Sequence, residues 1–186
     1  VRLLPEAERL WARLSADLKV ADGKYCLVTL HRPSNVDDPS VLEQIMSALN
    51  EISGKLPIVF PIHPRTRARL TDCSIKLSDN GNLHLIEPIG YLDFLCLQHC
   101  AKLVITDSGG IQEEATYLNI PCLTVRENTE RPVTVSMGTN ILVGKDMARL
   151  RAEAEAIIVG RTKRGSVPPL WDGHAADRIA AVLINT

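Results

Sequence analysis

The sequence predicts an α/β fold with a doubly wound parallel sheet of the Rossmann type, formed by a single domain over residues 1–186. Short runs rich in Val, Ile and Leu alternate with segments of helical spacing along most of the chain. No long polar or Pro/Gly/Ser-rich stretch divides it, and 45% of its residues are hydrophobic, as is usual for globular domains. Alternating strands and helices form right-handed βαβ units, so we expect helices on both faces of the sheet.

Six apolar runs are predicted to be strands. Each is only three to six residues long and is bounded by polar, glycine or proline residues, which is typical of the buried strands of a parallel sheet. They are residues 26–30, 57–62, 83–86, 103–106, 121–125 and 141–143.

Seven segments are predicted to be helices, four of which lie between the strands. The connecting helices have apolar residues at a spacing of three or four, and the others are amphipathic segments that frame the sheet or follow it. A stretch with Gly, Pro and basic residues, 160–169, is predicted to be an ordered loop between the last two helices. The predicted helices are 5–18, 39–52, 65–70, 91–99, 111–118, 146–159 and 172–184.

The charge balance excludes a general attraction to polyanions. With 21 basic and 22 acidic residues the net charge is −1, so we expect no binding to nucleic acid or to an anionic membrane, and any anion site must be local. No apolar run approaches the roughly 20 residues of a membrane span, and the chain opens with a charged helix rather than a signal peptide.

The five cysteines indicate a reducing compartment, which we expect to be the cytoplasm. Their number is odd and several lie in apolar runs, where free buried thiols are common. Cys96 and Cys100 are four residues apart, but no further pair of ligands has the spacing that a zinc site needs. We therefore expect neither a metal nor another cofactor.

The segment Asp107-Ser108-Gly109-Gly110 follows the fourth predicted strand and opens a helix. Two glycines let the backbone approach a ligand and adopt a positive φ, and the free amides and dipole of a helix start favour a phosphate. Asp, Ser and Gly are also good helix caps, so local chemistry supports capping and phosphate binding equally. One turn later, Glu114 is placed to accept hydrogen bonds from both hydroxyls of a ribose.

Two other strand ends carry a histidine and an arginine. His31-Arg32 follows the first strand, and His63 and Arg65 follow the second. A lone histidine here is more often structural, but two such pairs at equivalent points favour a shared site. Arginine forms paired hydrogen bonds with phosphates, and histidine donates to phosphate or exchanges protons near neutral pH.

The fifth strand is followed by a densely charged loop, residues 126–132. In isolation such a loop is usually a solvated connection. Ligands of open parallel sheets bind beyond the carboxyl ends of the strands, and four of the six strand ends here present charged or hydroxyl groups. The sequence contains neither G-x-G-x-x-G after a strand nor G-x-x-x-x-G-K-[ST], which disfavours dinucleotide binding and ATP hydrolysis.

Four motifs together resemble the non-hydrolysing UDP-N-acetylglucosamine 2-epimerases. They match that family in order and spacing, and the S-G-G-x-Q-E-E segment combined with T-E-R-P is specific to it. In this sequence they are Val28-Thr29-Leu30-His31-Arg32, Pro61-Ile62-His63-Pro64-Arg65, Thr106-Asp107-Ser108-Gly109-Gly110-Ile111-Gln112-Glu113-Glu114-Ala115 and Thr129-Glu130-Arg131-Pro132.

The resemblance implies a role for each of these residues. Members of the family have two Rossmann-like domains arranged as in GT-B glycosyltransferases, and this chain is similar to the second, the UDP-binding one. The implied ligands are UDP or a UDP-sugar, and the resemblance is compatible with a homodimer. It implies that Ser108, Gly109 and Gly110 hold the diphosphate, that Glu114 binds the ribose and that His63 and Arg65 line the nucleotide side. It also implies that the backbone of residues 87–90 faces the uracil, that His31 is catalytic and that Arg131 lies near the phosphates or the cleft.

The family inverts C2 of the sugar by eliminating UDP and adding it back on the other face. Its acid-base carboxylates lie in the amino-terminal domain, so we expect this chain alone to bind the nucleotide but to be inactive. A GT-B glycosyltransferase donor domain, a non-catalytic UDP-sugar binding module and a hydrolysing relative remain alternatives.

Two positions depart from the family pattern. Many members have a glutamate where this chain has Ser34, a position associated in some relatives with a second, regulatory nucleotide sugar, and a glutamate where it has Val133.

Overall fold

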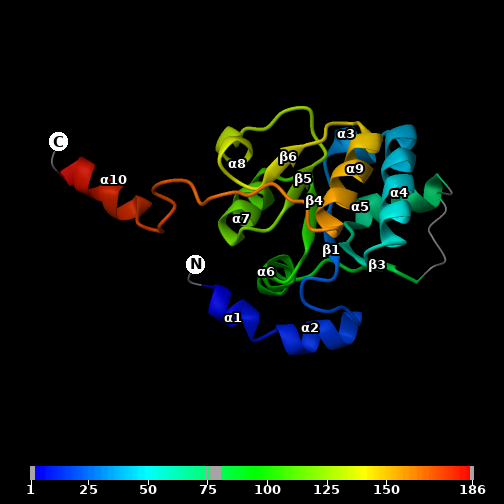
Figure 1. Cartoon of the computed structure of the whole chain (residues 1–186), viewed down its shortest axis with the longest axis horizontal. Coiled ribbons are helices and arrows are strands. Elements are labelled where there is room, and N and C mark those ends of the chain that lie inside the picture. Colours follow the sequence, from blue (N-terminus) through cyan, green and yellow to red (C-terminus); the bar gives the residue numbers. More distant parts are fainter. Residues whose placement is uncertain (1–2, 74, 76–80, 185–186) are drawn as a thin grey trace.

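Six parallel strands form one sheet in the computed structural model, which describes residues 3–73, 75 and 81–184 (Figure 1). The strand order is β3-β2-β1-β4-β5-β6, the order of a doubly wound fold, so the predicted fold class is confirmed. Each strand lies within one or two residues of its predicted range. The strands are β1 (Cys26–Thr29), β2 (Ile58–Pro61), β3 (Leu83–Ile86), β4 (Leu103–Thr106), β5 (Cys122–Thr124) and β6 (Asn140–Leu142).

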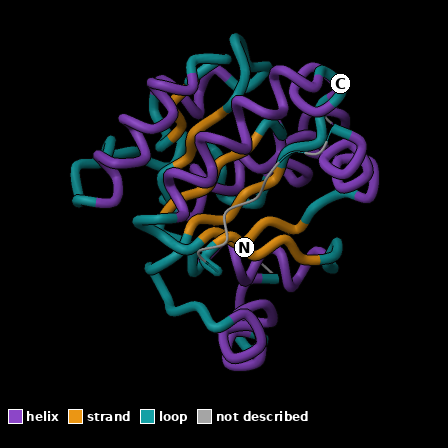
Figure 2. Tube along the Cα trace, turned by 90° about the vertical axis from the view of Figure 1, so that its right-hand side faces the viewer, coloured by secondary structure: helices purple, strands orange, loops and turns teal. Residues whose placement is uncertain are grey.

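Helices cover both faces of the sheet (Figure 2). Because side chains alternate along a strand, Cys26 and Val28 enter the core beneath α4 and α9, whereas Leu27 enters the core beneath α1, α2 and α6. β2 and β4 divide their side chains in the same way. The helices are α1 (Leu4–Glu8), α2 (Trp11–Leu18), α3 (Pro33–Val36), α4 (Pro39–Ser53), α5 (Pro64–Asp72), α6 (Tyr91–His99), α7 (Gly109–Leu118), α8 (Pro132–Ser136), α9 (Met147–Ile158) and α10 (Ala175–Ile184).

The prediction of one continuous helix over residues 5–18 was wrong, because the chain turns between α1 and α2. The Leu10 amide donates to the Ala7 carbonyl at 2.9 Å, which is a tighter turn than that of an α-helix. Both pieces pack against α6, and each buries one residue there, Ala7 and Leu14. Contact with a second helix therefore decides the break, which the apolar spacing alone does not reveal.

The short helices α3 and α8 were not predicted. They have four and five residues, too few for an apolar period to show. Each has a proline in its first turn, Pro33 and Pro132, whose fixed φ suits a helix start and whose missing N–H is not needed there. Four other helices start one to three residues away from their predicted positions: α5 at Pro64, α7 at Gly109, α9 at Met147 and α10 at Ala175.

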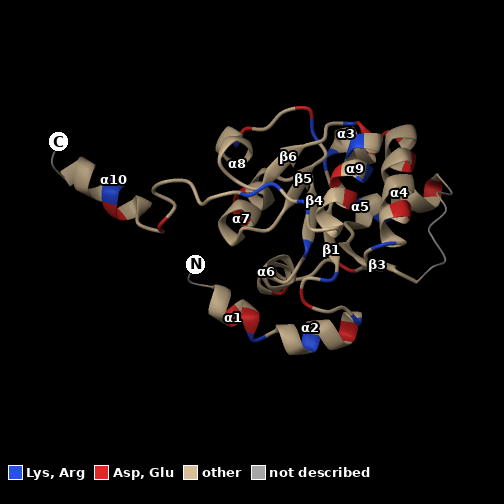
Figure 3. Cartoon of the chain, in the orientation of Figure 1, with Lys and Arg blue, Asp and Glu red and all other residues tan. Residues whose placement is uncertain are grey.

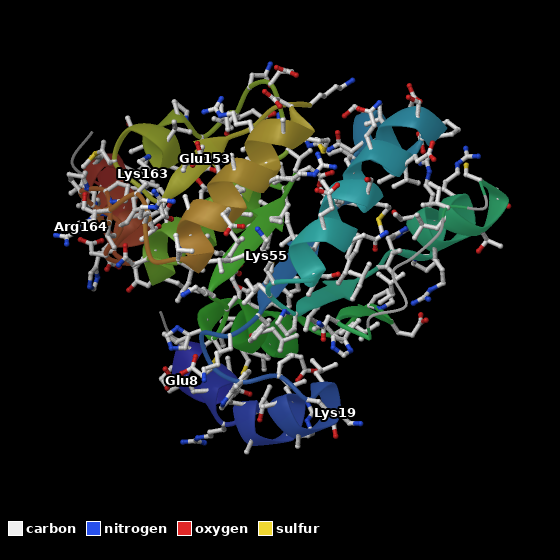
Figure 4. The ribbon with its side chains drawn as sticks, turned by 45° about the vertical axis from the view of Figure 1, so that its right-hand side comes forward. Glu8, Lys19, Lys55, Glu153, Lys163 and Arg164 are labelled. Carbon is white, nitrogen blue, oxygen red and sulfur yellow. The ribbon has the colours of Figure 1, made fainter. Side chains whose placement is uncertain are left out.

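The predicted loop 160–169 is confirmed, and it lies against α8 and the start of β6. Lys163 donates from Nζ to the backbone carbonyls of Val135 and Asn140 (Figure 4). Two residues further on, a Cβ on Gly165 would lie 2.6 Å from the carbonyl carbon of Gly138, so the two backbones touch. Beyond this loop α10 projects away from the sheet (Figure 1) and buries none of its residues.

None of the helices in the described ranges combines the length and the apolar character that a membrane crossing requires.

We expect Gly165→Ala to lower the free energy of unfolding by about 1 to 3 kcal/mol, since its methyl group would meet backbone atoms that have no room to move. Urea denaturation measures the change. Ser166→Ala is the matched control because Ser166 is exposed and its amide, which donates to Met137, is retained; its effect should stay within about 0.5 kcal/mol. Equal effects of the two variants would contradict the close approach.

Candidate functional site

The buried carboxylate of Asp107 joins the loops that follow β1 and β4. Asp107 is fully buried, and its Oδ2 accepts from the amide of His31 at 3.1 Å, from the amide of Arg32 at 2.9 Å and from Nδ2 of Asn35 at 3.0 Å. The Arg32 side chain returns a hydrogen bond from Nε to the Asp107 carbonyl at 2.9 Å. Asn35 also donates to the carbonyl of Val125 at 3.0 Å, which adds the loop after β5.

These loops meet at the topological switch point of the sheet. β1 pairs with both β2 and β4, and the chain runs outward from β1 in one direction and from β4 in the other. The crevice above such a point is where open parallel sheets bind ligands. A cavity of about 200 Å³ lies here, with His31, His63, Pro88, Ile89 and Phe94 among its lining residues.

The start of α7 offers backbone amides as hydrogen-bond donors, because the side chain of its N-cap residue does not bind them. Ser108 is the N-cap residue by position, yet its side chain makes no capping hydrogen bond. The first amides of a helix have no partner within the helix, so they remain available to an anion. The expectation of a positive φ was wrong for Gly109 and Gly110, both of which have ordinary helical geometry. Nothing in the described part of the chain requires a glycine at position 110 either, because a Cβ there would meet no atom within 4 Å and would face open space.

The two histidines have different surroundings. His63 is the N-cap of α5, and its Nδ1 accepts from the Arg65 amide at 3.2 Å, which places the proton of the neutral ring on Nε2. His31 is exposed, and its Nδ1 lies 3.4 Å from Oδ1 of Asp107. Arg65 pairs with Asp37 at 2.6 Å and is not among the residues that line the cavity.

Glu114 lies on α7 beside the first turn of α6. Its Oε1 accepts from the Tyr91 hydroxyl at 3.1 Å. Partial burial raises the pKa of the Glu114 carboxyl, and the hydrogen bond from Tyr91 offsets part of that rise. Tyr91 and Glu114 also line a larger cavity of about 680 Å³, which extends to Tyr117 and Trp171.

The arginines of the charged loop are all paired with acidic side chains. Arg126 donates to the carboxylate of Glu130 at 2.6 and 2.8 Å, and Arg32 lies 3.7 Å from the same carboxylate. The hydrogen bonds from Arg126 lower the pKa of Glu130 to about 2. Arg131 pairs with Glu113 of α7 at 3.1 Å.

Sequence analysis missed a buried polar cluster that holds this loop. The Oε1 of Gln112 accepts from Thr129 at 2.6 Å and from Asn140 at 3.1 Å, and Asn140 donates to Thr134 at 3.0 Å. Gln112, Thr134 and Asn140 are fully buried. A glutamine inside a helix and an asparagine at the start of a strand were the available signals, but their partners are distant in sequence.

The five cysteines are free thiols, and four of them are buried. Within the described ranges no group of three or more His, Cys, Asp or Glu side chains is arranged to hold a metal ion.

A doubly wound parallel sheet with an uncapped, glycine-containing helix start at its switch point defines the class of Rossmann-like domains that accept an anionic ligand at this edge. Residues 2–184 match the family model described as UDP-N-acetylglucosamine 2-epimerase, and the chain belongs to this family.

The similarity to individual relatives extends over most of the chain. It is 44% identical over 168 residues to the UDP-N-acetylglucosamine 2-epimerase of Methanocaldococcus jannaschii, covering 88% of this chain and 45% of that protein. It is 41% identical over 165 residues to the UDP-2,3-diacetamido-2,3-dideoxy-D-glucuronate 2-epimerase of Pseudomonas aeruginosa, covering 87% of this chain and 44% of that protein. The chain thus spans about half the length of the relatives it matches.

A solved structure is similar over the whole chain. The Methanocaldococcus jannaschii UDP-GlcNAc 2-epimerase in complex with UDP-GlcNAc and UDP superimposes with a TM-score of 0.84 and 41% identity, covering 100% of this chain and 51% of that one.

We expect Asp107→Ala to lower the free energy of unfolding by about 3 kcal/mol or more, because the amides of His31 and Arg32 and the side chain of Asn35 would lose a buried acceptor. Asp38→Ala is the control, since Asp38 accepts from two backbone amides at the exposed start of α4 and its loss should cost about 1 kcal/mol. Urea unfolding compares the two, and similar losses would show that Asp107 does not hold the loops together.

The paired Glu130 predicts a specific dependence of stability on pH. Its folded-state pKa of about 2 lies below the ordinary value of 4.5, so the unfolded chain binds more protons between these values. The stabilisation by this carboxylate is therefore complete above about pH 4.5 and is lost as the pH falls toward 2. We expect the difference in melting temperature between the wild type and Glu130→Gln to shrink over this range. Glu43→Gln, at an exposed position of α4, should show no such trend.

Proposed function

We propose that this chain is the UDP-binding half of a UDP-N-acetylglucosamine 2-epimerase, which interconverts UDP-GlcNAc and UDP-ManNAc by eliminating UDP and adding it back. The observation that carries the proposal is the start of α7, where Ser108 makes no side-chain cap and Gly110 faces open space at the switch point of the sheet. Family membership supports a nucleotide sugar as the ligand. The remaining half of the relatives' length would supply the amino-terminal domain of a GT-B architecture.

The proposed pose places the diphosphate at the helix start and the nucleoside across the neighbouring loops. Ser108 and the amides of Gly109 and Gly110 bind the phosphates, and the Glu114 carboxylate accepts from the ribose hydroxyls. The Nε2–H of His63 donates from the cavity wall, and the backbone of residues 87–90 contacts the uracil. Pro88 and Ile89, which line the cavity together with His63, fit a flat base. Arg65 and Arg131 complete the basic rim.

The chemistry that this half supplies is stabilisation of the leaving UDP. Negative charge grows on the diphosphate as the bond to C1 breaks, and a preorganised helix start stabilises that charge without rearrangement. His31 lies 3.4 Å from the buried Asp107 carboxylate, which orients the ring at the edge of the site, so His31 is placed to exchange protons. Acid-base groups at C2 and C3 of the sugar would come from the other half, so this chain alone is inactive.

Other functions remain as competitors of this proposal. A GT-B glycosyltransferase would bind its UDP-sugar donor at a similar site. A hydrolysing relative would differ in the residues that face the sugar from the other half, and a non-catalytic module would bind the nucleotide sugar without reaction. One relative is named for a different sugar, a diacetamido-glucuronate, although it is similar over most of this chain. This supports selection of the sugar by the half that lies outside this chain. A cytoplasmic setting agrees with the five free thiols, and a homodimer remains a prediction.

Calorimetry with UDP tests the site on this chain. We expect measurable binding, which Ser108→Trp and Glu114→Ala each weaken about ten-fold or more by blocking the phosphate subsite or removing the ribose acceptor. Tyr91→Phe is the control for Glu114, since it removes the hydrogen bond between the two side chains but keeps the carboxylate, and UDP affinity should persist. No heat of binding with the wild type would refute the site.

The reaction itself is tested on the full-length protein, with both halves present. We expect UDP-N-acetylglucosamine alone to yield its manno epimer. A product that forms only when a sugar acceptor is added would establish a glycosyltransferase instead, and release of free sugar with UDP would establish the hydrolysing reaction.

A further inference from the structure

The basic groups at the rim of the proposed site are already neutralised from within the chain. Acidic and basic residues occur together in the loop between β5 and α8 and near α7 (Figure 3). Arg131 pairs with Glu113, and Glu130 holds both Arg126 and Arg32. An anionic ligand must therefore exchange with these pairs rather than meet free cations.

Glu130 lies where a phosphate would bind. A Cβ built on Gly109, the first residue of α7, would be 3.9 Å from Oε2 of Glu130, so this carboxylate lies beside the uncapped helix start. It makes two short hydrogen bonds with Arg126 and lies 3.7 Å from Arg32. A helix start together with an arginine fork is the environment that proteins offer to a phosphate.

The two partners of this pair differ sharply in their exposure to solvent. The Arg126 side chain is only 8% exposed, whereas that of Glu130 is 59% exposed. A buried guanidinium without an anion would be strongly unfavourable, so it needs a partner whenever the site is empty. An exposed carboxylate, by contrast, can turn into water at little cost. The arginine is thus the fixed member and the glutamate the exchangeable one.

We propose that Glu130 is an internal counter-anion, which occupies the start of α7 in the ligand-free protein and which the diphosphate of the nucleotide displaces. On binding, the phosphates take over Arg126 and Arg32, and Glu130 turns outward. The inference rests on the proposed function, since it requires a diphosphate at this helix start. Glu130 weakens nucleotide binding and thereby sets the affinity of the site.

Glu130→Gln tests the exchange directly, because it keeps the shape of the side chain and a hydrogen bond to Arg126 but removes the competing charge. Titration of the full chain with UDP at pH 7 should show tighter binding to Glu130→Gln than to the wild type by about three- to ten-fold. The melting temperature of the ligand-free variant should fall and the increase caused by UDP should grow. Uridine, which has no phosphate, should show no affinity difference between the two proteins.

Glu127→Gln is the matched control. Glu127 belongs to the same loop, but its Oε1 accepts from the Lys145 amide between β6 and α9 at 3.2 Å, so the variant should bind UDP as the wild type does. If Glu130→Gln does not fold, Glu130→Asp replaces it, because the shorter side chain withdraws the charge from Arg126 and should also tighten binding.

The outcomes separate this inference from the proposed function. A wild-type protein that does not bind UDP refutes the proposed function. A wild-type protein that binds UDP, together with a Glu130→Gln variant that binds it equally or more weakly, overturns the inference alone, since Glu130 would then be a fixed support of Arg126. An equal gain in affinity for uridine would also overturn it. Glu130 is proposed to compete with the diphosphate for Arg126 and Arg32, and such competition cannot affect a ligand without phosphate.

Discussion

The buried carboxylate of Asp107 is the constraint on which the rest of the site depends. A carboxylate without access to water must be surrounded by donors, and here the chain provides them from the turn after β1, through two backbone amides and the side chain of Asn35. The next residue, Ser108, is the N-cap of α7, so His31 and the helix start are fixed relative to each other by a single side chain. Asn35 extends the connection to β5 through Val125. Three strand ends therefore behave as one rigid platform, which is what preorganised binding requires.

Local pairing of charge limits how strongly the arginines of this nearly neutral protein attract anions in general. A surface of unpaired cations would bind nucleic acid and phosphate alike, with little selectivity. Where each arginine is already paired with a carboxylate, a ligand must displace that carboxylate. Only a ligand that also makes further contacts gains free energy on binding. In the proposed pose, the hydroxyl of Ser108 and the carboxylate of Glu114 offer such contacts to a nucleoside diphosphate, but not to a simple anion.

The sheet was predictable because its signals are local. Val28 and Ile105 belong to short apolar runs whose alternation with helices leaves few topologies open, and the motifs at the strand ends identified His31, His63 and Ser108 as candidates. What was missed depends on contacts distant in sequence. The turn between α1 and α2 follows from packing on α6, and Gln112 meets Thr129 and Asn140 only in the folded chain. Asp107 was recognised as a cap candidate, but its true partners lie more than 70 residues earlier.

The exposed helix α10 makes the end of this chain energetically separate from the sheet. Ile179, Val182 and Leu183 are each more than 60% exposed, so the helix receives no stabilisation from the core. Its order rests on local contacts, chiefly Asp172, which accepts from the His174 amide and from Arg178. Ten helical residues with so few contacts are marginal in water. Because α10 buries none of its residues, a change in the helicity of this segment would leave the packing of the six-stranded sheet undisturbed.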